Sequence, residues 1–233
     1  MDIDEVKAEV GKQAVSRYVK SGMKLGLGTG STAVWAIRRI GELLSRGSLT
    51  DIRGVATSSQ SVMEAQKQRI PLRSLNDPEI AGALDLTIDG ADQVDDKLRV
   101  TKGGGGALLV EKIIAYASDQ VVFVVDEGKV VEQLGLSFPV PVEVVPEARV
   151  SVTRAMEDLG ARVEVRMAVR KMGPVITDNG NILLDLHFDS PFDVVKMESE
   201  LNLIPGVVEN GLFTRCSPAV LVGRKDGTIQ TRP

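Results

Sequence analysis

In the first 125 residues, segments whose apolar positions have helical spacing alternate with short apolar runs typical of strands. Residues 4–20 place apolar side chains along one helix face, and residues 23–27 form a short apolar run typical of a strand. The alternation continues with helices at 32–44 and after Gln60, and with strands at 52–56, 70–75, 84–88 and 121–125. Strands that alternate with helices predict an α/β fold with a doubly wound parallel sheet.

The pattern of the chain changes near Phe138-Pro139-Val140-Pro141. Beyond it, strand-like segments at 162–170 and 182–186 are joined through Asp178-Asn179-Gly180-Asn181, which is a strong turn signal. Helices are predicted on either side of this pair, at 147–159 and 192–201. Antiparallel strands with two helices are typical of a small α+β unit.

This change of pattern predicts two domains. We place a main parallel-sheet domain at residues 1–131 and 206–233, and an inserted α+β subdomain at 132–205. The segments at 207–213 and 219–222 are expected to return to the larger sheet.

Composition and charge exclude several classes of protein. The 233 residues carry a net charge of −4 and 3% aromatic residues, so neither a basic surface nor a stacking platform for nucleic acid is expected. No segment approaches the ~18 uninterrupted apolar residues of a membrane helix. One cysteine, Cys216, and one histidine, His187, leave too few ligands for a typical zinc site and argue against Ser-His-Asp or Cys-His catalysis. We therefore expect a cytoplasmic protein in which both residues are structural.

The most informative segment runs from Lys102 through four consecutive glycines, Gly103–Gly106, into a predicted helix. Consecutive glycines cost backbone entropy and are expected where backbone N–H groups must come close to a ligand. Glu111 shares the apolar face of that helix with Ala107 and Ile114, and partial burial raises the pKa of a carboxylate into the range of a general base. Lys102 is placed to stabilise an oxyanion. The alternative is a flexible loop with a surface lysine and a glutamate on a helix face, and the combination of residues favours catalysis.

A second loop has the features of a phosphate site. Gly28-Thr29-Gly30-Ser31-Thr32 follows a predicted strand and places hydroxyl and N–H groups at a helix N-terminus, where an anion is favoured. Ser31 stands where a dinucleotide fingerprint has its third glycine, and no lysine follows Gly30 as a Walker loop requires. A small phosphorylated ligand therefore fits better than NAD or ATP.

Two further polar loops also follow strands, where ligands of open parallel sheets bind. Asp89-Gly90-Ala91-Asp92 places two carboxylates three residues apart, which suits binding of sugar hydroxyls or magnesium, or proton transfer. An Asx-type turn with one solvated acid is an equal alternative for this motif alone. Ser58 and Ser59 fit helix caps as well as they fit a binding site. Together with Lys102 and Glu111, the two aspartates favour recognition of hydroxyl groups.

These motifs together resemble ribose-5-phosphate isomerases of type A. The matching segments keep the order of that family over nearly the whole chain. They are GLGTGSTA at 26–33, TSS at 57–59, DGAD at 89–92, KGGGG at 102–106, EKIIA at 111–115, FPVPVEVVP at 138–146, ITDNGN at 176–181 and IPGVVENGLF at 204–213. Two small departures are Gln93, where an acid is common, and Asp126-Glu127-Gly128 before Lys129, where a serine-containing form is usual.

The resemblance implies interconversion of D-ribose 5-phosphate and D-ribulose 5-phosphate through an enediolate, with no metal ion and no cofactor. It also implies a Rossmann-like main domain, a ferredoxin-like subdomain, and a homodimer or homotetramer. By this analogy Glu111 is the proton acceptor. The substrate contacts implied are Thr29, Gly30, Ser31, Thr32, Asp89, Gly90, Ala91, Asp92, Lys102, Gly103, Gly104, Gly105 and Lys129.

Aldose–ketose chemistry then suggests separate roles for these residues. Our hypothesis is that Glu111 moves a proton between carbons 2 and 1, while Lys102 and nearby N–H groups stabilise the enediolate oxygens. Asp89 would assist ring opening, and Asp92 would hold sugar hydroxyls. The phosphate is assigned to Thr29, Ser31 and Thr32, with Lys7 from the first helix as a further candidate.

Two rival functions share parts of this pattern. A sugar-phosphate sensor, such as the effector domain of a repressor, needs the phosphate loop but neither Lys102 nor Glu111. A coenzyme A transferase would use Glu111 as a nucleophile on an acyl group. Fold analogy alone does not separate the three functions, and the placement of Lys102 and Glu111 favours the isomerase.

Overall fold

A computed structural model describes residues 1–232, which form two compact units. The first unit comprises Met1–Ala91, Val110–Val130 and the segment from Arg215 onward. The second comprises Asp92–Leu109 and Val131–Thr214. Residues 92–109, 131 and 206–214 thus lie with the second unit, whereas the sequence pattern placed them in the larger domain.

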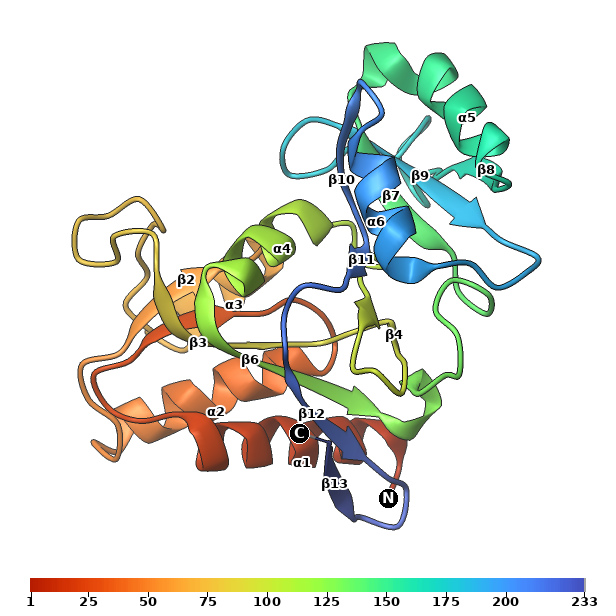
Figure 1. Cartoon of the computed structure of the whole chain (residues 1–233). Helices are drawn as coiled ribbons and strands as arrows, with labels where there is room; N and C mark the ends of the chain where they lie inside the picture. Colours follow the sequence, from red (N-terminus) through yellow and green to blue (C-terminus); the bar gives the residue numbers. More distant parts are fainter. Residues whose placement is uncertain (233) are drawn as a thin grey trace. The chain divides into compact units, whose positions relative to one another are not determined.

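The first unit is built on a six-stranded sheet with the order β13-β12-β6-β3-β1-β2 (Figure 1). All its strands are parallel except β13, which runs antiparallel to β12. The strands are β1 (Lys24–Leu27), β2 (Arg53–Ala56), β3 (Leu84–Asp89), β6 (Ser118–Asp126), β12 (Ala219–Gly223) and β13 (Ile229–Arg232). The chain winds outward from β1 to β2 and then returns to β3 on the other side of β1, so β1 and β3 flank a topological switch point. The predicted Rossmann-like sheet is confirmed.

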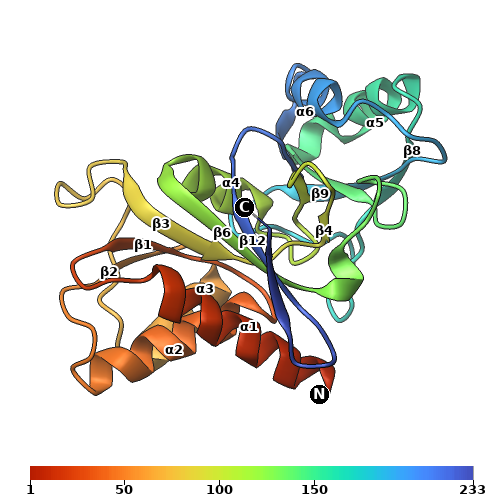
Figure 2. The same ribbon diagram turned by 60° about the horizontal axis from the view of Figure 1, so that its bottom comes forward.

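Helices cover both faces of this sheet. Figure 2 shows α1 (Ile3–Tyr18), α2 (Ala33–Ser45) and α3 (Ser59–Lys67) on one face. Their apolar stripes meet the sheet in a core that includes Val10, Ile37 and Leu86. The other face is covered by α4 (Leu108–Tyr116), whose Ile114 packs with Val55, Ile80 and Leu84.

The second unit contains the β-α-β-β-α-β order of a ferredoxin-like fold. Its antiparallel sheet has the order β10-β7-β9-β8. The elements are β7 (Val140–Val144), α5 (Arg149–Asp158), β8 (Arg162–Val165), β9 (Ile182–His187), α6 (Val194–Asn202) and β10 (Val207–Asn210). A small sheet of β4 (Gln93–Val94), β5 (Val100–Thr101) and β11 (Leu212–Phe213) completes the unit. The turn predicted at 178–181 is present, with Gly180 at φ +83°.

Three strand predictions were wrong. The segment at 207–213 does not return to the larger sheet, because β10 pairs with β7 and β11 pairs with β5. The segment at 70–75 forms only an isolated bridge between Leu72 and Gly54. The strand-like run expected at 162–170 ends at Val165. Strand β7 was not predicted because of the prolines at 139 and 141, although Pro141 lies inside that strand opposite Asp185.

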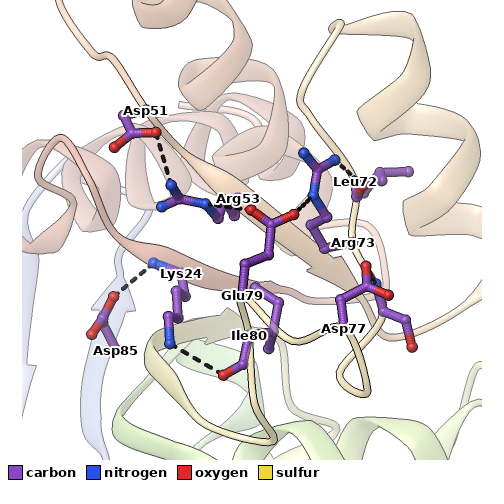
Figure 3. Close-up of polar contacts among 10 residues, drawn as sticks. Lys24, Asp51, Arg53, Leu72, Arg73, Asp77, Glu79, Ile80 and Asp85 are labelled. Carbon is purple, nitrogen blue, oxygen red and sulfur yellow. Dashed lines mark hydrogen bonds and ion pairs between the residues drawn. The ribbon is translucent and has the colours of Figure 1, made fainter.

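Ion pairs gather at the amino ends of the strands in the first unit (Figure 3). Arg53, the first residue of β2, donates to Glu79 at 3.0 Å and lies 3.1 Å from Asp51. Arg73 donates to the other oxygen of Glu79. Lys24, the first residue of β1, donates its backbone N–H to a side-chain oxygen of Asp85 at 2.7 Å. At this end of the sheet, the carboxylates of Asp51 and Glu79 are thus paired with arginine side chains.

Among residues 1–232, no helix is long and apolar enough to cross a membrane.

Candidate active site

In the first unit, the carboxyl ends of β1 and β3 bring Thr29 and Asp89 together. The side chain of Asp89 is 1% exposed, and its Oδ1 accepts the backbone N–H of Thr29 at 2.9 Å and that of Gly90 at 2.7 Å. These two bonds fix the direction of the carboxylate. The phosphate loop and the acidic loop are thus joined at the switch point of the sheet.

Gly26 and Gly28 leave the space that this contact needs. A Cβ on Gly28 would lie 2.3 Å from Oδ1 of Asp89, and a Cβ on Gly26 would lie 1.9 Å from the Thr87 hydroxyl. The two glycines therefore allow strand β1 to approach β3 and the side chains above it. Their role here is close packing against Asp89 and Thr87.

The Thr29 hydroxyl contacts the loop that follows β2. It lies 2.7 Å from the Thr57 hydroxyl and donates to the Ser58 hydroxyl at 2.6 Å. Ser58 also caps α3 by accepting the backbone N–H of Ser61 at 3.2 Å, so the helix-cap interpretation of Ser58 is confirmed. These hydroxyls fix the shape of the loop before α2.

The N-terminus of α2 has the properties of an anion site. Gly30 has φ +109°, Ser31 is exposed, and the side chain of Thr32 makes no capping bond to the helix. The first turn of α2 contains no acidic residue, so its dipole and N–H groups are not opposed by a carboxylate. The N–H of Gly30 donates to Oε1 of Gln60 at 3.0 Å, which places an exposed side-chain oxygen at this end of the helix.

Two lysines of the first unit were predicted to contact the substrate. Lys129 ends the short helix η1 (Glu127–Lys129), which directly follows β6 and therefore lies at the same sheet edge as Asp89. Asp126 begins this helix and accepts the N–H of Gly128 at 3.0 Å, so the acid that departs from the family pattern serves as a cap. Lys7 lies on α1, where its ammonium group is 3.8 Å from Asp4.

In the second unit, the glycine loop is a tight turn with fixed ends. Gly103 and Gly106 have φ values of +102° and +79°, which side chains rarely adopt, and the N–H of Gly106 donates to the Gly103 carbonyl at 3.0 Å. Asp92 accepts the N–H of Gly104 at 2.7 Å. The backbone N–H of Lys102 donates to the carbonyl of Gly211 at 2.8 Å, and the lysine is 3% exposed. Asp92 and the loop after Lys102 are thus joined.

The helix after this loop carries two buried charged residues. Glu111, in the first turn of α4, is 4% exposed, and Lys112 is 2% exposed. The predicted withdrawal of Glu111 from water is confirmed. Burial of Lys112 was not predicted, because a lysine after a glutamate in an amphipathic helix has no pattern that distinguishes it from a surface residue.

The remaining residues singled out in the sequence, Gln93, His187 and Cys216, are at least partly buried within the protein. Gln93 is 2% exposed, donates to the Ser137 hydroxyl at 2.7 Å and accepts the N–H of Gly135 at 2.8 Å. His187 lies on β9, 3.5 Å from Glu164, and Cys216 is half-buried and forms no disulfide. Within residues 1–232, no group of three or more His, Cys, Asp or Glu side chains is arranged to hold a metal ion.

Comparison with known proteins identifies the family of this chain. Residues 53–227 match the model of the family described as ribose 5-phosphate isomerase A (phosphoriboisomerase A). The ribose-5-phosphate isomerase A of Treponema denticola is 46% identical, with 99% of both chains covered, and that of Thermococcus kodakarensis is 44% identical, with 97% of both covered.

Solved structures agree with the sequence relatives. The ribose 5-phosphate isomerase A of Methanocaldococcus jannaschii superposes with a TM-score of 0.92 at 43% identity, covering 99% of each chain. A D-ribose-5-phosphate isomerase in complex with phospho-erythronic acid superposes with a TM-score of 0.94 at 42% identity, covering 100% of this chain and 99% of that one. The chain described here belongs to the ribose 5-phosphate isomerase A family.

Proposed function

We propose that Glu111 is the catalytic base of the interconversion of D-ribose 5-phosphate and D-ribulose 5-phosphate that this family member carries out. Starting from the open-chain aldose, Glu111 removes the proton from carbon 2 to give an enediolate. The same carboxyl group returns a proton to carbon 1, and the proton of the carbon-2 hydroxyl is transferred to the carbon-1 oxygen. The C2–H bond is thus replaced by a C1–H bond, and no external oxidant or reductant is consumed.

The observation that carries this proposal is the burial of two opposite charges next to one glycine loop. Lys102 and Glu111 are 3% and 4% exposed, on either side of Gly103–Gly106. Removing an ionised group from water is costly, and such groups are concentrated at functional sites. An enediolate gains negative charge on its oxygens, so a lysine and directed N–H groups stabilise it more than the neutral sugar.

Asp89 and Asp92 are proposed to recognise and open the sugar. Asp89 is oriented by the N–H groups of Thr29 and Gly90, which favours a carboxylate that accepts a hydroxyl proton during ring opening. Asp92 accepts from Gly104 through Oδ2 and is proposed to bind sugar hydroxyls through its remaining acceptor capacity.

The phosphate is proposed to bind at the N-terminus of α2. The N–H groups and hydroxyls of residues 30–32 supply donors there, and Lys129 at the end of η1, just after β6, supplies positive charge at the same edge of the sheet. Lys7 is a further candidate for this role. A phosphate bound in this way would displace the Gln60 side chain from the N–H of Gly30.

A test of this function is conversion of ribose 5-phosphate by the purified protein after treatment with a chelator. We expect rapid formation of ribulose 5-phosphate by the wild type, and a loss of roughly 10²–10⁴-fold in kcat for Glu111→Gln, the usual worth of acid–base catalysis. Glu157→Gln is the matched control, because Glu157 is exposed on α5. Binding of ribose 5-phosphate without conversion would indicate a sensor, and a covalent glutamyl adduct with an acyl-CoA would indicate a transferase.

The assembly and location of the protein form a separate part of the proposal. The family resemblance supports a homodimer or homotetramer, and the single cysteine, which excludes an internal disulfide, is consistent with the reducing cytoplasm. Light scattering coupled to size exclusion tests the assembly, and a mass of 25.0 kDa, that of one chain, would contradict it.

A further inference from the structure

Arg166 contacts the back of the glycine loop. It lies one residue beyond β8, and its Nη1 donates to the carbonyl of Gly103 at 2.7 Å and to that of Gly104 at 3.2 Å. The Gly103 carbonyl also accepts the N–H of Gly106, so Arg166 bonds the same oxygen that closes the turn. The guanidinium group therefore holds two successive peptide groups of the loop.

Asp185 holds the guanidinium in this position. Its Oδ2 accepts from Nε of Arg166 at 2.8 Å, and its Oδ1 accepts from Nη2. Asp185 pairs with Glu164 across β8 and β9, and Arg166 follows Glu164 by two residues, so Arg166 and Asp185 share a sheet face. Their side chains are only 17% and 15% exposed. The two bonds to Asp185 use Nε and Nη2 on one edge of the guanidinium, so Nη1 donates to the loop.

The contact determines where the loop N–H groups point. In a trans peptide, the C=O of one residue and the N–H of the next are directed to opposite sides. The carbonyl of Gly103 faces Arg166, and the N–H of Gly104 on the other side donates to Asp92 at 2.7 Å. The carbonyl of Gly104 also faces Arg166, so the N–H of Gly105 is directed away from the guanidinium.

We propose that Arg166, held by Asp185, is a positioning residue that orients the N–H groups of Gly104 and Gly105 for the reaction. Four flexible glycines would otherwise sample many backbone conformations. Arg166 fixes the carbonyls of Gly103 and Gly104 on one side of the loop. The N–H groups of Gly104 and Gly105 are therefore directed to the opposite side, where Asp92 accepts the N–H of Gly104. This inference rests on the proposed role of the glycine loop in stabilising the enediolate.

Arginine is suited to this position, and lysine is not. A planar guanidinium can donate two hydrogen bonds to the Asp185 carboxylate and use a third nitrogen to donate to the carbonyls of Gly103 and Gly104. An ammonium is a point charge whose donors have no fixed planar arrangement. Arg166→Lys keeps the charge and most of the stem, but it cannot keep both sets of contacts. The conservative substitution is therefore informative even if Arg166→Ala folds poorly.

The test compares Arg166→Ala and Arg166→Lys with Arg162→Ala. Arg162 begins β8, four residues before Arg166 and on the same sheet face, and it pairs with the exposed Glu164 without a contact to the loop. We expect kcat to fall by ~10–10²-fold in both Arg166 variants, because small misplacements of catalytic groups have effects of this size, while KM for ribose 5-phosphate stays within about threefold. Arg162→Ala should retain the wild-type kcat.

Two additional readouts separate positioning from simple loss of folding. Affinity for 4-phospho-D-erythronate, whose carboxylate resembles the enediolate, should fall in parallel with kcat. Guanidinium chloride below denaturing concentrations should restore part of kcat to Arg166→Ala, because Asp185 can bind the added cation. It should not restore Arg166→Ala/Asp185→Asn.

Unchanged kcat in Arg166→Lys would overturn the inference, as would a loss that matches the unfolded fraction and does not respond to guanidinium. Failure of the proposed function gives a different result, because the wild-type protein itself would then not convert ribose 5-phosphate.

Discussion

The two ends of the six-stranded sheet in the first unit use charged side chains in different ways. At the amino ends, Glu79 accepts from the guanidinium groups of Arg53 and Arg73, as Figure 3 shows. At the carboxyl ends, the buried Asp89 is held by backbone N–H groups of Thr29 and Gly90. Exposed ion pairs contribute little to stability and leave few acceptors for a ligand. A carboxylate oriented by the main chain has a defined direction, which suits recognition of a substrate.

Among substitutions at the two ends of the sheet, Asp89→Asn is expected to have the largest effect on kcat/KM. Asparagine keeps an oxygen for the N–H groups of Thr29 and Gly90 but loses the charge, so the fold should be retained while kcat/KM falls by ~10²-fold, within the range for acid–base groups. Asp119→Asn is the matched control, because Asp119 is an exposed residue near the amino end of β6. Steady-state assays and thermal melts measure the two effects. A kcat/KM similar to that of the control would show that the charge of Asp89 is dispensable.

Gly28→Ala should have a smaller effect on activity and a clear effect on stability. The added Cβ would lie 2.3 Å from Oδ1 of Asp89 and 2.5 Å from its Cα, so β1, β3 or the carboxylate must shift. Overpacking of this kind costs roughly 1–3 kcal/mol. Chemical denaturation measures the cost, and kcat/KM should fall together with it because Asp89 is displaced. An alanine variant with wild-type stability and rate would show that the packing against Asp89 is not restrictive.

Glu79→Gln is expected to have the smallest effect, confined to stability. The hydrogen bond from Arg73 lowers the pKa of Glu79 below its ordinary value of 4.5. Because the pKa is lowered in the folded protein, the stabilisation is present above 4.5 and is lost as the pH falls through the lowered value. The variant should therefore melt slightly below the wild type at neutral pH, and the difference should disappear in acid, while kcat is unchanged. A Tm difference that grows in acid would contradict this assignment.

The sequence predicted the parts of the site that lie in motifs at strand ends. Thr29 follows β1 and Asp89 ends β3, and the rules for open parallel sheets place such residues at one edge of the sheet. The burial of Glu111 followed from helical periodicity. These inferences depend only on residues close together in the chain.

The parts that were missed depend on contacts between residues far apart in sequence. Arg166 is 63 residues from Gly103 and 19 from Asp185, and nothing in its local sequence distinguishes it from the exposed Arg162. Pro139 and Pro141 obscured strand β7, because proline normally ends a strand. β10 was assigned to the wrong sheet, since the sequence of a short strand does not indicate which of two sheets it will join.

The central claim, that Glu111 moves the proton between carbons 2 and 1, is tested most directly by isotope transfer. Conversion of ribose 5-phosphate in D₂O, followed by NMR, reports deuterium at carbon 1 of the product and exchange at carbon 2 of the remaining substrate. The carboxyl group that carries the proton exchanges part of it with solvent before returning it, so the wild type should give partial deuteration at carbon 1. Glu111→Gln should lose this signal together with turnover. Deuterium transfer that continues in Glu111→Gln at the wild-type rate would contradict the account and assign the base to another residue.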